Sequence, residues 1–349
     1  MAGRVVTKLK NRVHLALNIC TYKREDQLKH NISQLLQSKF FDDLEEEYYG
    51  KLDIFIVDNA SEINMESNPF VHLFHNPNTG GSGGFQRGIE EIRKYDNEFT
   101  HVIFMDDDVS FENSCFYILF DFLRTEEEIY KKRPVAGRMI DKDNPTIQWT
   151  AAEKWNGGDI QHVEFLRDIS DGTYQPGKVD YNIDADYGGW WFCCYPYSFV
   201  KDNDVMPFFL HCDDVEYGLR CGEKPIIIEG VQVWHETWEK KMSPEMVYYD
   251  VRNSLFVNKM YGINQDYNQI ISEWKNKIGY YHARHKYNYE YMGIKGMADY
   301  LKGLEHLSRI DSTNNHNKLK KNKGNRFLNA LLWRVMRQKV DINGGENNG

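Results

Sequence analysis

The chain has 349 residues, of which 41% are hydrophobic and 27% charged, so it can bury a large core as one big domain or as two. Its net charge of −9 leaves no broad basic excess to neutralise phosphates, which argues against a nucleic-acid binder. No run of about 18 apolar residues and no signal-peptide core are present, so we expect no transmembrane helix and a cytoplasmic protein. The six cysteines show no CxxC spacing and fit reduced, mostly buried thiols.

The first 140 residues predict strands that alternate with helices. The expected strands are His14–Cys20, Leu52–Val57, Val71–His75 and Val102–Met105, and the expected helices are Glu25–Ser38, Phe85–Tyr95 and Glu112–Tyr130. This alternation predicts a parallel sheet with right-handed crossovers. Polar residues follow every strand, and in a parallel sheet all these positions lie on one edge.

Further along, the pattern changes. Residues 141–187 are irregular, 188–235 are dense in aromatic and acidic residues, 243–310 are largely helical, and 318–323 form a basic run. A short amphipathic helix is expected over Arg326–Lys339, and the tail that follows it is expected to be disordered.

The most informative motif is a short strand that runs into three carboxylates. Val102–Met105 are apolar and precede Asp106, Asp107 and Asp108, so a buried strand would deliver carboxylates to the edge where α/β folds bind ligands. Asp106 and Asp108 are two apart, and a turn would let both reach one hard divalent cation that also touches phosphate oxygens. The alternative is a solvated acidic turn or the cap of the next helix.

Asn78 and the glycine-rich segment Gly80-Gly81-Ser82-Gly83-Gly84 form a candidate diphosphate loop. Glycines let backbone amides approach an anion, and a helix that starts near Phe85 would add its positive end. The dinucleotide and P-loop motifs are absent, which excludes those two readings. The alternative is a flexible turn.

Polar residues after the first two strands are candidates for nucleotide binding at the same edge. Thr21 and Arg24 follow the first strand, and Asp58 follows the second, where it could hydrogen-bond a base or a ribose. Asp58-Asn-Ala-Ser is equally a good turn and helix-cap sequence, and Arg24 equally fits the exposed start of a helix.

Two tryptophans follow a glycine pair in Gly188-Gly189-Trp190-Trp191. The glycines indicate that something approaches the backbone closely, and an indole face suits an acceptor sugar. The alternative is that both rings belong to the core.

A second acidic cluster, Asp213-Asp214-Val-Glu216, is expected on a helix, where Asp213 and Glu216 share a face. A carboxylate there could act as a general base, although an acidic helix start also stabilises the helix dipole. His235 ends another expected strand. His235 with Asp106, Asp108 and phosphate oxygens fits Mn²⁺, and Mg²⁺ less well.

Taken in order, these segments resemble the inverting, nucleotide-sugar-dependent glycosyltransferases of family 2 with the GT-A fold, and among them the bacterial galactofuranosyltransferases. The matching segments are Thr21-Tyr-Lys-Arg24, Val57-Asp-Asn, Asn76-Pro-Asn-Thr-Gly-Gly-Ser-Gly-Gly-Phe-Gln-Arg87, Met105-Asp-Asp-Asp108, Gly189-Trp-Trp191, Asp213-Asp-Val-Glu-Tyr217, Trp234-His235 and Val251-Arg-Asn253. The double Trp, the Asp-Asp-Val-Glu-Tyr segment and Trp-His-Glu point to galactofuranose. The glycine-rich and Asp-x-Asp parts are shared with rhamnosyl and other hexosyl transferases.

The resemblance implies an α/β fold of the GT-A type, with a mostly parallel twisted sheet flanked by helices. It implies a catalytic domain over residues 1–262, a helical C-terminal region over 263–340 and a disordered tail over 341–349. It also implies metal-dependent, inverting transfer of galactofuranose from UDP-galactofuranose to a hydroxyl of a surface-glycan acceptor, with Mn²⁺ or Mg²⁺ as cofactor.

The resemblance also implies a role for each matching residue. Asp106, Asp108 and His235 would hold the metal that bridges the diphosphate, and Asp214 would be the base. The nucleotide would be bound by Thr21, Arg24, Asp58, Asn78, Gly80, Gly81, Gly83, Gly84 and Asp107, and the sugars by Trp190, Trp191, Asp213 and Glu216. Polymerising members carry a β-rich domain ahead of the catalytic one, and about a dozen residues precede the first strand here, so we expect addition of one or a few residues.

The segment 318–339 predicts an interfacial helix. One stripe contains Phe327, Leu328, Leu331, Leu332, Val335 and Met336, and its flanks contain Arg326, Arg334, Arg337 and Lys339, with Lys318, Lys320, Lys321 and Lys323 ahead of it. This pattern fits an anionic membrane surface, where a lipid-linked acceptor would be found, and places the protein at the inner face of the cell membrane. The alternative is a helix docked on the catalytic domain or on a second copy of the chain in a homo-oligomer.

Three competing functions stay open. The donor could instead be dTDP-rhamnose or a UDP-hexose. A non-catalytic nucleotide-sugar-binding module would have no need of a base, and a hydrolase with paired carboxylates would have no need of a diphosphate cradle.

Overall fold

The structure is a computed structural model that describes residues 11–95, 98–237, 242–263 and 267–346. They form two compact units. The first contains the described residues of 1–155, 160–205 and 217–237, and the second those of 156–159, 206–216 and 238–349. These units do not coincide with the division predicted at residue 262, which stays a prediction.

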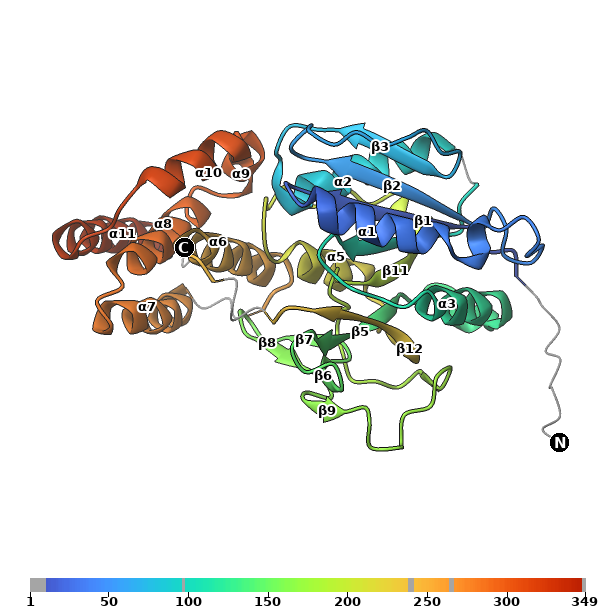
Figure 1. Cartoon of the computed structure of the whole chain (residues 1–349). Coiled ribbons are helices and arrows are strands. Elements are labelled where there is room, and N and C mark those ends of the chain that lie inside the picture. The colour runs from blue at the N-terminus through green and yellow to red at the C-terminus, as the bar shows by residue number, and fades with distance from the viewer. Residues whose placement is uncertain (1–10, 96–97, 238–241, 264–266, 347–349) are drawn as a thin grey trace. The chain divides into compact units, whose positions relative to one another are not determined.

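A mostly parallel sheet forms the centre of the first unit (Figure 1). Its strands are β1 (Leu15–Thr21), β2 (Leu52–Asp58), β3 (Val71–His75), β4 (His101–Asp106), β5 (Val135–Asp141), β10 (Val179–Asp180), β11 (Cys193–Pro196) and β12 (Ile226–His235), in the order β10-β12-β5-β11-β4-β1-β2-β3. β1 pairs parallel with β2 and β4, and β12 pairs parallel with β5, whereas β11 runs antiparallel between β4 and β5. The expected α/β fold with a mostly parallel sheet and a helical C-terminal region is therefore confirmed.

Short strands fill the segment predicted to be irregular. β6 (Ile147–Thr150) pairs with β5 and with β9 (Arg167–Asp168), and β7 (Glu153–Trp155) pairs with β8 (Ile160–His162). These strands have two to four residues each, which explains why no alternating pattern was visible over 141–187.

Helices cover both faces of the sheet. α1 (Glu25–Leu36) and α3 (Ser114–Thr125) pack against one face, where Leu28 and Leu119 meet Leu17 of β1 in one core. α2 (Gly80–Ile92) packs against the other face, where Ile89 joins Phe55 of β2 in a second core. α4 (Tyr197–Val200) follows β11. Because side chains alternate along each strand, the two cores use alternate residues of the same strands.

The glycine-rich segment is helical, which corrects the expectation of a loop before a helix at Phe85. α2 begins at Gly80, so the whole glycine run forms its first turns. A Cβ at Gly84 would collide with Cys20, and one at Gly88 with Asn18, both on β1. These two glycines therefore let α2 lie directly on the sheet, and packing outweighs the low helix propensity of glycine.

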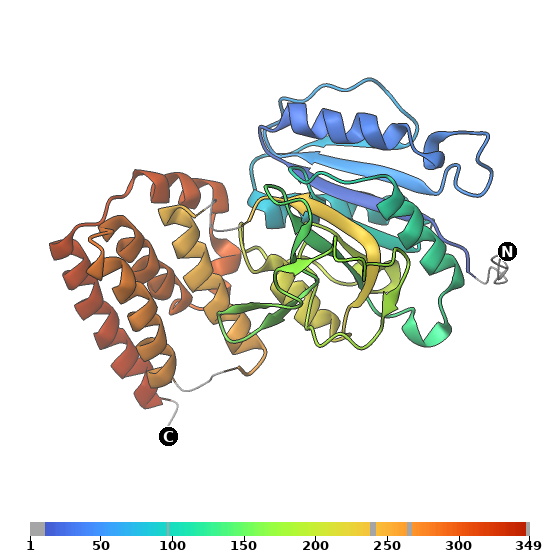
Figure 2. The same ribbon diagram turned by 60° about the horizontal axis from the view of Figure 1, so that its bottom comes forward.

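The second unit is a bundle of helices, which Figure 2 shows side by side. They are α6 (Pro244–Met260), α7 (Tyr267–Ala283), α8 (Tyr287–Tyr300), α9 (Leu304–Arg309), α10 (Ser312–Lys321) and α11 (Arg326–Glu346). α8 lies against α6, α7 and α11. Among the residues that the structure describes, no helix has both the length and the apolar composition that crossing a membrane requires.

α11 is longer than predicted. It is described to Glu346, although the sequence predicts an end at Lys339 and a disordered tail over 341–349. Each residue added to an existing helix gains a hydrogen bond without a new nucleation cost, so the Asn-Gly-Gly segment does not end it at once. Residues 347–349 lie outside the described residues.

Candidate active site

Three predicted metal ligands come together at the carboxyl edge of the sheet. The loop after β4 is joined to the end of β12 by two backbone hydrogen bonds, from Ser110 N to Trp234 O at 2.8 Å and from Trp234 N to Ser110 O at 2.7 Å. This bridge places His235 beside the loop, with its Nε2 2.9 Å from Asp108 Oδ1 and 3.7 Å from Asp106 Oδ2.

This trio fits a divalent metal. One ligand atom from each of Asp106, Asp108 and His235 lies within 4.8 Å of the other two, and it is the one such group found among the described residues. The Asp106 side chain is 39% exposed and that of His235 11%, so one side of the trio is open. Two carboxylates and an imidazole suit Mn²⁺, and an open side leaves room for phosphate oxygens.

Arg24 holds the third carboxylate of the motif. Its Nη1 donates to Asp107 Oδ1 at 2.7 Å, and its Nη2 lies 3.4 Å from Asp108 Oδ2. The side chain of Asp107 is 4% exposed, and burial raises its pKa while Arg24 opposes that rise. Asp107 therefore acts here as the partner of Arg24, and the direct nucleotide contact predicted for it has no support in the structure.

Amide side chains of α1 hold this loop in place, and the sequence reasoning missed them. Asn31 Nδ2 donates to Val109 O at 2.9 Å and to Asp107 O at 3.3 Å, and Gln34 Nε2 donates to Phe111 O at 2.6 Å. Asn31 is buried within an otherwise apolar helix face. A buried amide needs hydrogen-bond partners, and that was the signal available in the sequence.

Asp58 is fully buried, and its carboxylate accepts hydrogen bonds from backbone amides of the loop that follows it. Its Oδ1 accepts from Ala60 N at 2.8 Å, and its Oδ2 accepts from Glu62 N at 2.7 Å and Ile63 N at 2.8 Å. Burial acts to raise the pKa of Asp58, but these hydrogen bonds hold it below its usual value. The carboxylate therefore shapes the turn, which was the alternative, and the nucleotide contact stays a prediction.

Asparagines connect the ends of β2 and β3 to the start of α2. Asn59 Nδ2 donates to Gly80 O at 2.8 Å, and Asn76 Nδ2 donates to Asn59 Oδ1 at 2.8 Å. Asn78 Oδ1 accepts from Gly80 N at 3.1 Å, and Gly80 has a φ of +73° that favours glycine.

The start of α2 shares the edge that holds the carboxylates. Cys20 Sγ lies 4.0 Å from Gly80 O, and Cys20 pairs with Asp106 in the sheet register. Backbone N–H groups in the first turn of a helix have no intrahelical partner, so Gly81 and Gly83 still suit an anion. Thr21 ends β1 at this same edge and is buried.

The two tryptophans have separate environments. Trp190 is 4% exposed, and its ring stacks on Phe104 with the centroids 4.6 Å apart. Trp190 therefore packs in the core, which was the alternative, and its sugar contact stays a prediction. Trp191 is partly buried, its Nε1 donates to Gly137 O at 2.8 Å, and its ring covers Gly189. The close approach predicted for the glycine pair is therefore made by Trp191 at Gly189, and by Ala136 and Cys193 at Gly188.

The second acidic cluster starts α5 (Asp213–Cys221), as predicted, and its first residues belong to the second unit. Asp213 and Asp214 are half-buried, and Asp214 Oδ1 accepts from Val215 N at 2.8 Å. Glu216 is 1% exposed and accepts from Tyr261 OH at 3.0 Å. The buried Glu216 carboxylate therefore has a partner in Tyr261, just after α6, and the sugar contact predicted for it stays a prediction.

The amino-acid sequence matches the model of one family over a long stretch. The model described as "Glycosyl transferase family 2" matches residues 17–197, which is more than half of the chain. The chain belongs to glycosyl transferase family 2. The expectation of a glycosyltransferase is thus confirmed at the level of the family.

Two curated proteins that are similar in sequence to this chain have the same name. It is 28% identical over 266 residues to the galactofuranosyltransferase GlfT2 of Mycolicibacterium smegmatis, covering 69% of this chain and 39% of that protein. It is 27% identical over 273 residues to GlfT2 of Mycobacterium tuberculosis, covering 69% of this chain and 40% of that protein. The chain spans about two fifths of the length of these relatives.

Two solved structures are distantly similar to this chain. One is GalNAc-T7 with UDP, GalNAc and Mn²⁺, at a TM-score of 0.49 and 11% identity, covering 72% of this chain and 48% of that one. Another is the mannosyltransferase PcManGT of Pyrobaculum calidifontis with GDP-Man and Mn²⁺, at a TM-score of 0.44 and 9% identity, covering 99% and 89%.

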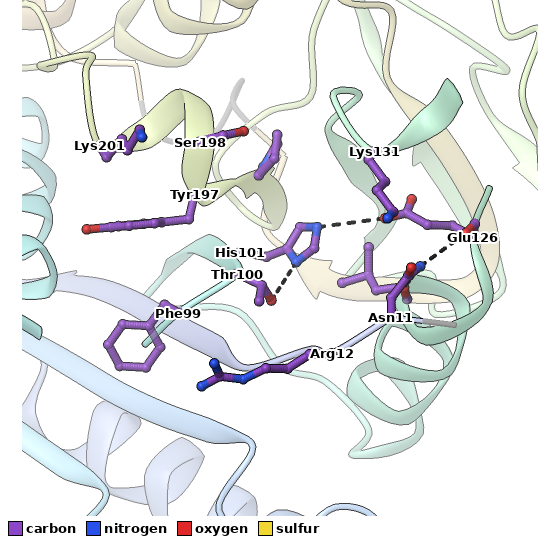
Figure 3. A pocket seen from close by; sticks show the side chains of 12 residues that line it. Asn11, Arg12, Phe99, Thr100, His101, Glu126, Lys131, Tyr197, Ser198 and Lys201 are labelled. Carbon is purple, nitrogen blue, oxygen red and sulfur yellow. Dashed lines mark hydrogen bonds and ion pairs between the residues drawn. The ribbon is translucent and has the colours of Figure 1, made fainter. Parts of the chain in front are cut away.

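Figure 3 shows the side chains that line a hollow of about 430 Å³ in the first unit. This hollow lies at the edge of the sheet opposite the one that holds the carboxylates. It is lined by residues that precede β1 and β4, such as Arg12 and Thr100. His101 Nε2 lies 4.0 Å from Glu126 Oε1 inside it. Burial raises the pKa of Glu126 to about 7 and lowers that of His101 to about 4.

Glu126→Gln is expected to remove a pH dependence of stability. A folded-state pKa of about 7, above an ordinary value of 4.5, means that Glu126 makes the protein less stable as the pH rises between these values, whereas His101, with its pKa lowered to about 4, acts in the opposite direction. Because solvent screens part of the cost of ionising Glu126, we expect its contribution to lower the free energy of unfolding by a quantity of the order of 2 kcal/mol. Denaturant unfolding at pH 5 and pH 8 measures it. If the free energy of unfolding changed with pH equally in the variant and the wild type, the raised pKa of Glu126 would be contradicted.

Proposed function

We propose that this family 2 protein is a metal-dependent glycosyltransferase that moves galactofuranose from UDP-galactofuranose to a hydroxyl of a glycan acceptor with inversion. The observation that carries the proposal is the trio of Asp106, Asp108 and His235 at the same sheet edge as the start of α2. A bound Mn²⁺ or Mg²⁺ would neutralise charge that develops on the leaving diphosphate. The glycine amides of α2 would hold the same anion from the other side.

Other residues complete the proposed site. Arg24 is half-exposed and already touches the acidic loop, so it can approach a donor phosphate. Asp214 takes the proton from the acceptor hydroxyl as that oxygen attacks the anomeric carbon, and the bond to the diphosphate breaks in the same step. Asn78 and Thr21 would contact the nucleotide, and Trp191 and Asp213 would contact the sugars.

The choice of galactofuranose rests on the names of the relatives and on the sequence resemblance. The structure itself fits any nucleoside diphosphate sugar, so dTDP-rhamnose and UDP-hexoses are the competing donors. A binding module is disfavoured because the metal trio is intact and half-buried carboxylates lie at the start of α5.

A panel of nucleotide sugars tests the proposal, with release of nucleoside diphosphate as the readout and glycan acceptors of bacterial surface type present. We expect release from UDP-galactofuranose that depends on Mn²⁺ and stops when a chelator is added. Release from another donor would overturn the galactofuranose assignment. Donor binding without any release would favour the binding module.

We also propose that α11 contacts an anionic membrane surface that carries the acceptor. Phe327 is 87% exposed, Leu331 58% and Val335 46%, and they repeat every four residues along one stripe. Met336 is buried and lines a small pocket with Leu332, Val335 and Ile294 of α8, so part of the predicted stripe faces α8, and Phe327 and Leu331 are its most exposed members. Side chains from 337 onward lie outside the described residues, so Arg337 and Lys339 stay predictions.

The chain is expected to sediment with phosphatidylglycerol vesicles and not with phosphatidylcholine vesicles, because exposed lysines and Arg334 flank the stripe. Phe327→Ser with Leu331→Ser should abolish this binding without a change in thermal unfolding, since both side chains are exposed. A folded wild type that ignores both vesicle types would end the membrane proposal.

A further inference from the structure

The segment just before α5 has an unusual backbone. Phe209, His211 and Cys212 have φ values of +74°, +67° and +65°. Residues with a Cβ rarely adopt this left-handed conformation, and nowhere else in the described ranges do three such residues fall within four positions. Strain of this kind persists only where surrounding groups impose it, and it collects at functional sites.

Two neighbouring side chains of α6 impose this conformation through the backbone. Asn253 Nδ2 donates to Leu210 O and to His211 O, both at 2.8 Å. Arg252 Nη2 donates to Phe208 O at 2.6 Å, and its Nε donates to Asn253 Oδ1 at 2.8 Å. Asn253 is 0% exposed and Arg252 2% exposed, so water cannot replace these hydrogen bonds.

Further contacts from α6 fix the strained side chains. His211 Nε2 lies 3.0 Å from Asp250 Oδ1, and Cys212 Sγ lies 3.6 Å from Ser254 Oγ. The Phe209 ring stacks on Tyr249 with the centroids 5.4 Å apart. One stretch of α6 therefore contacts the whole segment, and Cys212 O accepts from Glu216 N at 3.0 Å in the first turn of α5.

We propose that Asn253, supported by Arg252, is a positioning residue that acts through Asp214. It holds the strained segment so that α5 starts at Asp213 and the Asp214 carboxylate has one orientation. This inference rests on the proposed function, in which Asp214 is the base. Without the two hydrogen bonds from Asn253 Nδ2, the segment relaxes toward ordinary backbone conformations, and the Asp214 carboxylate loses its alignment with the acceptor hydroxyl.

Asn253→Ala is the test, and Asn258→Ala is its matched control. Asn258 also lies on α6, is 1% exposed and donates at 2.8 Å to a backbone carbonyl outside the strained segment, Gly157 O. We expect kcat to fall about 100-fold in Asn253→Ala alone, with the KM for the donor and the affinity for UDP with Mn²⁺ unchanged. Equal losses of kcat in both variants would overturn the proposal.

Two combined variants separate positioning from general destabilisation. Asn253→Ala in the Asp214→Asn background should cost little more than Asp214→Asn alone, because both changes remove the same step. Cys212→Gly should restore most of the turnover lost in Asn253→Ala, since glycine adopts a positive φ without strain. The positioning role would be contradicted if the losses of kcat from Asn253→Ala and Asp214→Asn multiplied in the double variant. It would also be contradicted if Cys212→Gly restored no turnover to Asn253→Ala.

Hydrogen exchange provides a readout that does not depend on turnover. Amides of residues 209–215 should exchange faster in Asn253→Ala and unchanged in Asn258→Ala, even if the proposed reaction is wrong. Suppose that exchange is faster in Asn253→Ala but that Asp214→Asn turns over like the wild type. Asn253 would then hold the strained segment, but Asp214 would not be the base, and the proposed positioning through Asp214 would be rejected. Unchanged exchange would reject the positioning role itself. If Asn253→Ala does not fold, Asn253→Leu fills the volume and serves in its place.

Discussion

Asp108→Asn is expected to lower turnover by about 10³-fold and to weaken Mn²⁺ binding by at least roughly 100-fold. The Asp108 carboxylate is 2.9 Å from His235 Nε2 and is one of three ligand groups, so the variant loses a negative charge where the metal needs one. Titration calorimetry with Mn²⁺ in the presence of UDP measures the affinity, and diphosphate release measures turnover.

Asp141→Asn is the matched control for this metal prediction. Asp141 pairs with His235 across the sheet, but its carboxylate accepts from Asp143 N at 2.9 Å and from Asn144 Nδ2 at 2.8 Å in its own turn. Its removal should leave Mn²⁺ affinity unchanged. If Asp108→Asn binds Mn²⁺ like the wild type, the trio is not the metal site.

Asp214→Asn is expected to lower kcat by about 10²- to 10⁴-fold while UDP and Mn²⁺ bind as before. An Asn oxygen can still accept from Val215 N, which now donates to Asp214 Oδ1 at 2.8 Å, so the helix start is kept and only the basic group is lost. Single-turnover kinetics with saturating donor measures the chemical step.

Asp213→Asn gives a comparison for the base assignment. It removes a half-buried carboxylate from the neighbouring position, so an acceptor contact there predicts a higher KM for the acceptor and a smaller change in kcat. A reversal of the two results would make Asp213 the base. Wild-type turnover in Asp214→Asn would end the present assignment.

Strand positions and the grouping of Asp106, Asp108 and His235 could be predicted from the sequence because apolar runs that end in polar residues place side chains at one edge. Asp106 and Asp108 needed only the end of β4 and a turn, and His235 needed only the end of β12. The short strands and the exact start of α2 could not be predicted. The short strands have too few residues to show a periodic pattern, and the start of α2 depends on contacts with β1 that no local pattern contains, such as Gly84 against Cys20.

Residue roles were harder to predict than positions. Asp58 and Trp190 occupy the predicted places, but a buried carboxylate used by backbone amides and a ring stacked on Phe104 look the same in sequence as functional residues. Asn31 and Asn253 were overlooked as positioning residues because their partners are carbonyl groups of distant segments. Every residue type has a backbone carbonyl, so the sequence does not indicate which residue accepts such a hydrogen bond.

The Ser110–Trp234 bridge has a consequence for how the first unit folds. Asp108 and His235 are 127 positions apart in the chain, so the trio exists only after a long loop has closed. A metal that binds the closed arrangement alone would stabilise the folded unit by about 2.7 kcal/mol at a concentration 100 times its Kd. Divalent ions would then raise the melting temperature, with a stabilisation that grows with the logarithm of the ratio of ion concentration to Kd, so that a bound metal would also hold the ends of β4 and β12 together in the folded unit.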